Sequence, residues 1–331
     1  MYPSVVPNPV GRMKGFILEN EKIRAVITPG FGARILSLIY KPTETDFVWH
    51  NPRIPPMKPT YDPAFEDMSG LFDCFPTCEA CTVRGIKLPM YGEVASEPWR
   101  VSSKRKTGRS ITLSMQRKCD AYPMTIEKSL SISRKEPVLN LDYTVSNLTD
   151  DTLEYHYSGH NTLNVNPSFR ILLPREVTKV KRGMAVTDRL GKLGDEIPWP
   201  QTTDINGKAL DISKLGQPCD GTGENLYTPK LRDSWCAAFN ESRKEAIGFW
   251  FEAEKLPYIL LWINCGGYGG YYHTALEPST GRPDNLEVAV REWKNFATIE
   301  PRAKISWAER LFLSHDVKRI EKVTPDRGIM Q

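Results

Sequence analysis

The sequence predicts an all-β protein, built as one large antiparallel β-sandwich. Short segments rich in β-branched and aromatic residues follow one another along the chain, separated by turns that contain Gly, Pro, Asn or Asp. The clearest segment, residues 139–146, alternates apolar and polar residues. No stretch keeps a 3.6-residue apolar repeat for more than two turns, so strands rather than helices are expected to supply the core.

Two predicted strands near the start of the chain form an opening hairpin. The first covers residues 23–27 and ends at a Pro-Gly pair, and the second covers residues 33–40. Residues 41–70 are rich in proline and polar groups, with only a hint of helix at 64–68. We therefore expect this segment to form a loop over the surface or over a site.

The middle of the chain has the clearest strand periodicity. Ile111, Leu113 and Met115 alternate with polar residues, as residues 139–146 do. One apolar and one polar face are typical of a half-buried antiparallel strand. Further strands are expected at residues 153–160, 169–173, 246–251 and 305–313.

The stretch most closely connected with function is residues 257–285. Its apolar run at 258–263 is too short for a helix and predicts a buried strand that ends at a cluster of glycines. A second strand, at 271–276, delivers Glu277 to a strand end just before a turn of prolines and glycine. Because glutamate is depleted in strands, this position suits a site better than a core.

Composition indicates an ordinary globular protein. The chain has 331 residues, of which 40% are hydrophobic and 25% charged, enough for a substantial core. We see no internal repeat or linker, so a single domain over residues 1–331 is expected, with a frayed tail after about residue 320. Prolines interrupt the start of the chain, and no apolar stretch reaches membrane-spanning length. These features predict a soluble, cytoplasmic protein without a membrane partner.

The charge pattern does not indicate a nucleic-acid partner. The net charge is +4, and the densest basic run, residues 104–106 with Arg109, is expected to be a solvated hairpin tip. No recognition motif accompanies this run, so we predict no nucleic-acid binding. The seven scattered cysteines, an odd number, are consistent with a reducing compartment.

Glu277 and the histidines are the first candidates for chemistry. His156 and His160 fall on one expected strand, four residues apart, and so share a face unless Gly159 introduces a bulge. His273 likewise shares the face of Glu277. An imidazole and a carboxylate from different strands of one concave sheet would form an acid/base pair. The alternative is that these histidines are hydrogen-bonded residues at a sheet surface.

Cys74, Cys78 and Cys81 are the second candidates. Their C-x3-C-x2-C spacing is the one that holds an iron–sulfur cluster in radical enzymes that use S-adenosylmethionine. Those enzymes have an α/β barrel, whose strand–helix alternation this sequence lacks, and a zinc site would need a fourth ligand. We expect buried free thiols, and no metal or other cofactor.

Two further features lie beside Glu277. The glycines at 266–270 resemble a dinucleotide fingerprint only superficially, because the sixth position is Tyr272 and a strand follows. A turn that brings the backbone close to a ligand is expected instead. Trp262 lies directly before this turn, and although most tryptophans of a sandwich belong to the core, we assign this one to a site.

Several segments, in this order, resemble the galactose mutarotase-like (aldose 1-epimerase) superfamily. They are ITPGFGARILSL (27–38), LFDCFPTCEACT (71–82), LPMYGEVASEPWRV (88–101), VSNLTDDTLEYHYSGHNTLN (145–164), and LPYILLWINCGG with ALEPSTGRPDNL (256–286). The ordered set is most similar to divergent, sugar-epimerase-like branches. The resemblance implies the galactose mutarotase-like supersandwich and a small carbohydrate substrate.

The resemblance also implies a mechanism. Glu277 in LEPSTGRPD matches the general base of the family, and His160 matches its general acid. Glu277 would take the proton of the anomeric hydroxyl while His160 protonates the ring oxygen. The ring opens, the C1–C2 bond rotates, and closure with exchanged roles gives the other anomer. This chemistry requires no cofactor.

One position departs from the family pattern. Tyr91-Gly92 stands where many relatives have a histidine-glycine pair, which leaves the identity of the sugar open, although tyrosine can still donate a hydrogen bond. Ordinary surface charge is the alternative role for the charged residues of the flanking segments. The residues we predict to contact the substrate are Asp73, Arg84, Tyr91, Glu93, His156, Trp262 and His273.

Three functions therefore stand at this stage. The first is an aldose 1-epimerase-like enzyme that acts on a sugar or sugar acid. The second is a carbohydrate-binding protein of the same fold without turnover, and the third is a metal-dependent enzyme that uses the three cysteines. The presence of both His160 and Glu277 favours the first, because a binding protein needs neither an acid nor a base.

Overall fold

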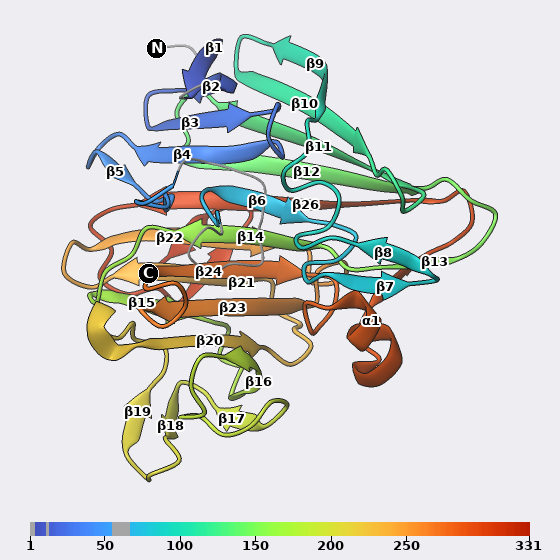
Figure 1. The fold of residues 1–331 in the computed structure, drawn as a ribbon. Helices are drawn as coiled ribbons and strands as arrows, with labels where there is room; N and C mark the ends of the chain where they lie inside the picture. The colour runs from blue at the N-terminus through green and yellow to red at the C-terminus, as the bar shows by residue number, and fades with distance from the viewer. Residues whose placement is uncertain (1–3, 11–12, 55–66) are drawn as a thin grey trace.

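The computed structural model describes residues 4–10, 13–54 and 67–331. Within these residues, two antiparallel β-sheets pack face to face (Figure 1), and we call them the large sheet and the small sheet. The predicted all-β sandwich is thereby confirmed. Helical structure in the described part is limited to a 3-10 turn at Pro218–Asp220, helix α1 at Leu286–Val288 and a π-helical turn at Ala289–Trp293.

The large sheet has twelve strands among the described residues. Their spatial order is β1-β2-β3-β4-β6-β14-β24-β23-β20-β16-β17, and β5 pairs with β4. The strands are β1 (Ser4–Val10), β2 (Met13–Glu19), β3 (Ile23–Thr28), β4 (Arg34–Tyr40), β5 (Thr45–Asp46), β6 (Leu71–Cys74), β14 (Ser158–Leu163), β16 (Lys179–Ala185), β17 (Glu196–Pro198), β20 (Thr222–Tyr227), β23 (Tyr258–Cys265) and β24 (Tyr272–Ser279).

The small sheet has eight strands in the described part, in the order β15-β21-β22-β26-β12-β11-β10-β9. They are β9 (Arg100–Lys106), β10 (Ser110–Lys118), β11 (Met124–Ser133), β12 (Val138–Asn147), β15 (Phe169–Leu172), β21 (Trp235–Asn240), β22 (Glu245–Phe251) and β26 (Lys304–Ser314). The remaining strands form two-stranded pairs: β7 (Cys81–Val83) with β8 (Ile86–Leu88), β13 (Leu153–Tyr155) with β25 (Ala297–Ile299), β18 (Gln201–Thr203) with β19 (Ala209–Asp211), and β27 (Lys322–Thr324) with β28 (Gly328–Met330).

Most predicted strands are confirmed to within about two residues at each end. The predicted opening hairpin is formed by β3 and β4, but β1 and β2 precede it and pair with each other. The sequence of β1, SVVPNPV, contains two prolines, which weaken a strand prediction. Because β1 is the outermost strand of the large sheet, one of its sides needs no ladder hydrogen bonds, so prolines are tolerated there.

The predicted strand at residues 153–160 is wrong as a single strand. β13 ends at Tyr155 and pairs with β25, whereas β14 starts at Ser158 and joins the large sheet. Between them, the N–H of His156 donates to the carbonyl of Pro76 at 2.9 Å, outside either ladder. His156 and His160 therefore do not share a strand, and their spacing in sequence does not decide whether they share a face.

The strand that carries Glu277 is longer than predicted. β24 continues to Ser279, because Glu277 pairs with Leu260 and Ser279 pairs with Tyr258 across the β23–β24 ladder. Glu277 thus lies inside a strand rather than at its end. Its side chain projects directly from the sheet, whose rigidity is better suited to holding a reactive group than a loop is.

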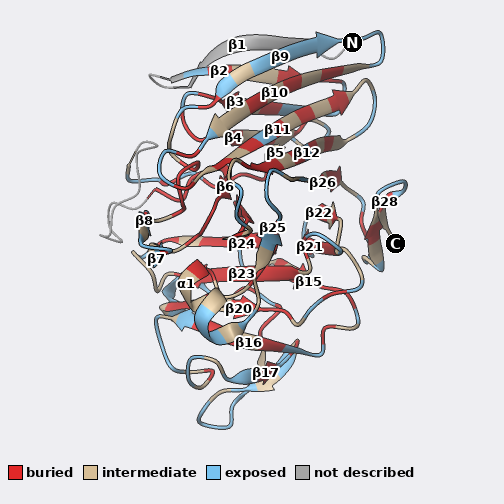
Figure 2. Ribbon diagram, turned by 90° about the vertical axis from the view of Figure 1, so that its right-hand side faces the viewer, coloured by how far each residue is buried: buried red, intermediate tan, exposed pale blue. Residues whose placement is uncertain are grey.

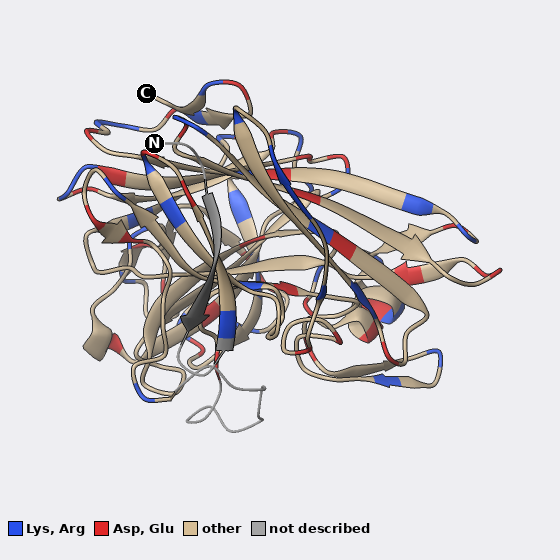
Figure 3. Ribbon diagram, turned by 90° about the horizontal axis from the view of Figure 1, so that it is seen from above, with Lys and Arg blue, Asp and Glu red and all other residues tan. Residues whose placement is uncertain are grey.

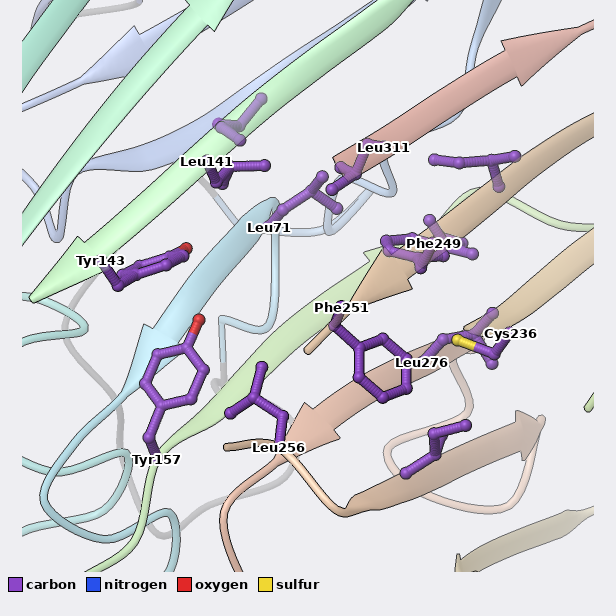
Figure 4. Close-up of a cluster of buried hydrophobic side chains, with 14 of the residues drawn as sticks. Leu71, Leu141, Tyr143, Tyr157, Cys236, Phe249, Phe251, Leu256, Leu276 and Leu311 are labelled. Atoms are coloured by element: carbon purple, nitrogen blue, oxygen red, sulfur yellow. The ribbon is translucent and has the colours of Figure 1, made fainter. Parts of the chain in front are cut away.

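The central strands of the large sheet are buried on both faces. β6, β14, β23 and β24 have almost no exposed residue (Figure 2). One face packs on the small sheet, where Leu71 and Leu276 meet Leu141, Phe249 and Leu311 (Figure 4). The opposite face, which we call the outer face, is covered by loops, and the candidate site lies there.

The end of the chain is ordered by packing rather than frayed as expected. β27 and β28 form a hairpin, and Val323 is fully buried. A Cβ built on Gly248 of β22 would meet side-chain atoms of Val323 and Ile329 at 2.9 Å, so the hairpin sits closely on the small sheet. Its apolar side chains cover a face of β22 that would otherwise contact water.

Three smaller expectations concern the surface. The hint of helix at 64–68 lies mostly outside the described residues, and Asp67 and Met68 are not helical. The basic run at 104–106 lies exposed on β9, the edge strand of the small sheet, while acidic and basic residues elsewhere are distributed over the ribbon (Figure 3). Charges on an edge strand discourage pairing with other chains. No helix in the described residues has the length and hydrophobicity that a bilayer span requires.

Candidate active site

The site is built from side chains that line up across the outer face of the large sheet. Because side chains alternate along a strand, the register between strands decides which of them share a face. β14 and β24 pair with Ser158 opposite Ser279 and Asn161 opposite Leu276. The same register places His160 opposite Glu277.

The structure brings His160 and Glu277 together in one cavity. His160 Nε2 lies 3.9 Å from Glu277 Oε1, and both side chains are almost completely buried. This distance is too long for a direct hydrogen bond, so neither group serves as the hydrogen-bond partner of the other. An imidazole and a carboxyl that face each other without bonding are both available to a ligand.

The cavity is small. The space that a water-sized molecule can occupy in it is about 70 Å³, below the ~300–1,000 Å³ that is typical of ligand pockets in proteins. The residues that line it are Met68, Cys78, Glu79, Met90, Tyr91, His160, Met184, Asn225, Trp262, Tyr268, Glu277 and Asp284.

His160 is held by aromatic rings and by a hydroxyl group. Its imidazole stacks on Phe72, the residue opposite it on β6, with ring centroids 4.5 Å apart and planes 14° apart. Tyr91 packs edge-on against the imidazole at 5.5 Å. Its Nδ1 lies 3.0 Å from the hydroxyl of Thr162. Burial lowers the pKa of His160 to about 3, and the positive charge of Arg34 contributes, so the imidazole is neutral.

Glu277 is held by one hydrogen bond and surrounded by acidic neighbours. The hydroxyl of Ser158 donates to its Oε2 at 2.9 Å, which leaves Oε1 facing His160. Burial raises the pKa of Glu277 well above its ordinary value, and the charge of Asp284 raises it further. The bond from Ser158 acts in the opposite direction.

Tyr91 and Trp262, two predicted contacts, also line the cavity. The backbone of Tyr91 has φ 61°, and Gly92 follows with φ 69°, so the chain turns sharply at this point. Trp262 donates from Nε1 to His273 Nε2 at 3.0 Å. The indole is therefore fixed in orientation on the floor of the cavity.

His273 lies behind the cavity rather than in its lining. Its ring packs on Trp49 with centroids 4.4 Å apart, and its Nε2 accepts the hydrogen bond from Trp262. Burial lowers the pKa of His273 to about 3, so the ring stays neutral and Nε2 remains an acceptor. His273 thus supports Trp262 and is not part of the cavity lining.

Asp73 faces the opposite side of the sheet from the one expected. Its neighbour Phe72 is opposite His160 on the outer face, so alternation points Asp73 into the space between the two sheets. There its carboxylate pairs with Lys128 Nζ at 2.9 Å and accepts from the hydroxyl of Tyr143 at 2.8 Å. Its role is structural, and it does not reach the cavity.

Three other predicted contacts also lie outside the cavity lining. Arg84 lies in the exposed turn between β7 and β8 and pairs with Glu154 at 2.8 Å. Glu93 accepts the N–H groups of Ala121 and Tyr122, at 2.7 and 2.9 Å, and so holds a loop. His156 is fully buried beside Ser279, and burial lowers its pKa to about 3.

Sequence analysis did not single out Glu79, Asn225 and Asp284, which are also part of the polar lining. Asn225 lies opposite Trp262 on β20, a strand that the sequence did not predict. Its Nδ2 donates to Asp284 Oδ2 at 2.9 Å, and Tyr227 donates to the same oxygen at 3.2 Å. Asp284 lies inside the segment ALEPSTGRPDNL, so its proximity to Glu277 in sequence was the one available signal.

The cysteine motif is not arranged as a metal site. Cys74 and Cys78 are buried free thiols. Burial raises the pKa of Cys74, and the neighbouring thiol of Cys74 together with burial raises the pKa of Cys78. Cys81 is partly exposed, with Sγ 3.5 Å from the hydroxyl of Thr77. Within the described residues, no three His, Cys, Asp or Glu side chains are grouped as metal ligands.

The glycine turn after β23 approaches protein backbone rather than the cavity. A Cβ on Gly266 would lie 1.9 Å from the carbonyl oxygen of Pro218, and one on Gly267 would lie 2.6 Å from the carbonyl carbon of Thr222. The expectation that these glycines bring backbone close to a ligand is therefore wrong. Tyr268, which lies in this turn, contributes to the cavity lining.

Comparison with solved structures identifies the fold. A candidate aldose 1-epimerase from Klebsiella pneumoniae is similar with a TM-score of 0.72 and 15% identity, over 92% of this chain and 80% of that chain. A galactose mutarotase-like protein from Clostridium acetobutylicum has a TM-score of 0.65 and 13% identity, over 95% of this chain and 99% of that chain. Another galactose mutarotase-like protein, from Lactobacillus casei, has a TM-score of 0.64 and 17% identity, over 91% of this chain and 100% of that chain.

No protein-family model matches the sequence, and no curated protein matches it. The chain therefore has the galactose mutarotase-like fold.

Proposed function

We propose that this protein is an aldose 1-epimerase-like enzyme, which interconverts the anomers of a sugar by acid/base ring opening. The observation that carries the proposal is the position of His160 Nε2 3.9 Å from Glu277 Oε1, with both residues in the lining of one cavity. Solved structures of the same fold are named as galactose mutarotase-like proteins, which supports the same chemistry.

The reaction begins with two proton transfers. Glu277 Oε1 takes the proton of the anomeric hydroxyl, while His160 Nε2–H gives its proton to the ring oxygen. The bond between the anomeric carbon and the ring oxygen breaks, and the open-chain aldehyde forms. His160 is left as an imidazolate. After rotation about C1–C2, the imidazolate takes the proton back from the hydroxyl formed at the ring oxygen, and Glu277 returns its proton to the aldehyde oxygen, which closes the ring as the other anomer.

Thr162 sets the proton on the correct nitrogen of His160. Its hydroxyl lies 3.0 Å from Nδ1, and when it donates to that nitrogen the imidazole proton stays on Nε2, facing Glu277. A neutral imidazole with a proton on Nε2 can act as an acid without first acquiring a charge. The low pKa of buried His160 is consistent with this neutral form.

The raised pKa of Glu277 strengthens it as a base. A general base works best when its pKa lies near the working pH, because a more basic carboxylate accepts the proton more readily. Burial raises the pKa of Glu277 above the ordinary value of glutamate, as it does in other enzymes that use carboxyl groups near neutral pH. Trp262 offers an indole face for the sugar ring, and Tyr91 and Asn225 offer polar groups for its hydroxyls.

The test is exchange between anomers, measured by NMR saturation transfer on a panel of aldoses and sugar acids. We expect exchange with the unmodified protein and a loss of ~10²–10⁴ in rate for Glu277→Gln, which keeps the shape but removes the base. Glu254→Gln, an exposed carboxylate away from the cavity, is the matched control and should leave the rate unchanged.

Two results would count against the enzyme. If Glu277→Gln exchanged anomers at the normal rate, the assigned base would be wrong. If the unmodified protein bound a sugar, seen by ligand-detected NMR, but exchanged no sugar of the panel, it would be a carbohydrate-binding protein of the same fold.

A further inference from the structure

The cavity is acidic. Its described lining contains three carboxyl groups, those of Glu79, Glu277 and Asp284, and no Lys or Arg. The chemistry proposed above uses Glu277 and His160. Glu79 and Asp284 remain, and nothing in ring opening requires two more carboxyl groups.

Glu79 and Asp284 are held next to each other by the backbone. The N–H groups of Cys78 and Glu79 both donate to the carbonyl oxygen of Asp284, each at 3.1 Å. The side chain of Asn285 also donates to the carbonyl oxygen of Ala80 at 3.3 Å. The loop after β6 and the loop after β24 are thereby tied together, and they present two carboxyl groups at one end of the cavity.

Asp284 has an unused acceptor. Its Oδ2 accepts from Asn225 at 2.9 Å and from Tyr227 at 3.2 Å. Its Oδ1 is buried and has no hydrogen-bond partner among the described residues, although the exposed fraction of Asp284 is only 7%. Buried polar atoms usually have a partner, and because Asp284 is part of the cavity wall, a donor group of a ligand would supply the one that Oδ1 lacks.

The carboxyl groups also repel one another. Burial is the largest cause of the raised pKa of Glu277, and the charge of Asp284 is the second. For Asp284, burial again raises the pKa most, and the charge of Glu79 is the second cause. The pKa of Asp284 is raised to about 8. A positive group between them would relieve this repulsion, whereas an anionic group would add to it. A neutral hydroxyl would satisfy Oδ1 without balancing any charge.

We propose that Glu79 and Asp284 select the substrate, and that it is an aldose with an amino group rather than a sugar acid or a sugar phosphate. This inference rests on the proposed function. The ammonium group donates to Asp284 Oδ1, and its charge is balanced by Asp284 and Glu79. Glu277 and His160 remain free to act on the anomeric hydroxyl and the ring oxygen.

The experiment compares sugars that differ in one group. Anomer exchange is measured by NMR for the 2-amino-2-deoxy derivatives of glucose, galactose and mannose, each with its N-acetyl derivative and its parent sugar. Glucuronic acid and glucose 6-phosphate represent the anionic class. We expect kcat/KM for at least one amino sugar to exceed that of its N-acetyl derivative and its parent by ~10-fold or more, and the anionic sugars to be the poorest substrates.

Two variants assign the preference to the carboxyl pair. Asp284→Asn and Glu79→Gln should each bring the ratio of amino sugar to parent sugar close to one. Glu79 is only partly buried, so its variant provides the test if Asp284→Asn does not fold. Glu292→Gln removes an exposed carboxylate that does not line the cavity, and should leave the ratio unchanged.

The outcomes separate this inference from the proposed function. If parent sugars or anionic sugars exchanged as fast as every amino sugar, the selection would be wrong while the epimerase activity stood. The same conclusion would follow if an amino sugar were preferred but both variants kept that preference. If no sugar exchanged at all, the proposed function and this inference would fail together.

Discussion

Burial sets the protonation of the two groups that face each other in the cavity. His160 and Glu277 are both almost fully buried, and burial disfavours the charged form of each. The pKa of the imidazole is lowered to about 3, and that of the carboxyl is raised, so their values move in opposite directions from the ordinary ones. The reaction therefore depends on the ionisation of Glu277, because His160 is neutral throughout the accessible pH range.

This dependence predicts the pH profile of activity. The rate of anomer exchange should rise with pH as Glu277 loses its proton, with a midpoint above 4.5, the ordinary value for glutamate. Asp284→Asn should move the midpoint to lower pH, because it removes a negative charge that raises the pKa of Glu277. Exchange rates of both proteins, measured over the pH range in which they stay folded, check this. A midpoint at or below the ordinary value, or one that moves upward in the variant, would contradict it.

The segment that carries Tyr91 depends on a glycine. Gly92 has φ 69°, and a Cβ built there would lie 2.1 Å from the carbonyl oxygen of Phe75. Glu93 N–H donates to that same oxygen at 2.8 Å, so the backbone cannot move away without losing a bond. Gly92 thus fixes the turn that brings Tyr91 against His160.

We predict that Gly92→Ala destabilises the protein more than Gly85→Ala does. Gly85 has φ 77° but open space around its Cβ position, so that variant carries backbone strain alone, ~1–2 kcal/mol. Gly92→Ala adds the clash with Phe75 and displaces Tyr91, so exchange activity should fall as well. Unfolding free energies from urea titration provide the comparison. If the two variants lost the same unfolding free energy, the contact with Phe75 would be relieved without strain, contrary to this prediction.

A buried polar network joins the two sheets behind the site. Asp73 of the large sheet pairs with Lys128 of the small sheet and accepts from Tyr143 and Tyr157, at 2.8 and 3.1 Å. The two tyrosine rings lie near each other between the sheets (Figure 4), and the hydroxyl oxygen of Tyr157 lies 2.8 Å from Glu309 Oε1, so Asp73 and Glu309 share its single proton. Removing one charge from such a network leaves its partner buried and unpaired.

Lys128→Met should therefore lower the free energy of unfolding by ~3–5 kcal/mol. The double variant Lys128→Met with Asp73→Asn should recover part of this loss, because it also removes the uncompensated carboxylate. Denaturant unfolding of the two variants and the unmodified protein measures both effects. A double variant less stable than Lys128→Met alone would show that the pair is not the main source of the loss.

The buried ionisable groups predict how the stability of the molecule depends on pH. The pKa is about 3 in the folded protein and ordinarily 6.5 for three buried histidines, His156, His160 and His273. Between these two pH values the unfolded chain binds more protons, so stability falls as pH decreases.

Two buried carboxyl groups have the opposite effect. The pKa of Asp284 is about 8 in the folded protein and ordinarily 3.8, and that of Glu309 is about 7 and ordinarily 4.5, so the folded chain binds more protons and stability falls as pH increases. Each group contributes ~1.4 kcal/mol per pH unit within its window.

The two trends oppose each other between pH 4.5 and 6.5, the ordinary values for glutamate and histidine. The three histidines outweigh the two carboxyl groups there, so we expect stability to rise slightly with pH, to a maximum near pH 6.5. We expect a steeper decline below pH 4.5, and a decline from pH 6.5 to 8, where only the carboxyl groups act. Unfolding free energies at a series of pH values test this. A stability that increased steadily from pH 4.5 to pH 8 would contradict it.

The sequence by itself determined the class of the fold and the two central residues of the candidate site. Alternation at residues 139–146 and the apolar run at 258–263 predicted strands that the structure confirms, because side-chain alternation is a local property of each segment. The resemblance at HNTLN and LEPSTGRPD indicated His160 and Glu277, which the structure places opposite each other.

Only the tertiary structure decided which neighbours of those residues line the cavity. Asp73 and Phe72 are adjacent in sequence, yet the pairing of β6 with β14 sends one to the buried network and the other to His160. Asn225 and Asp284 become part of the site because β20 lies beside β23 and the loop after β24 folds back on it. The physical reason is that strand order and register depend on burying whole sheets against each other, and a shift of one residue would exchange the two faces.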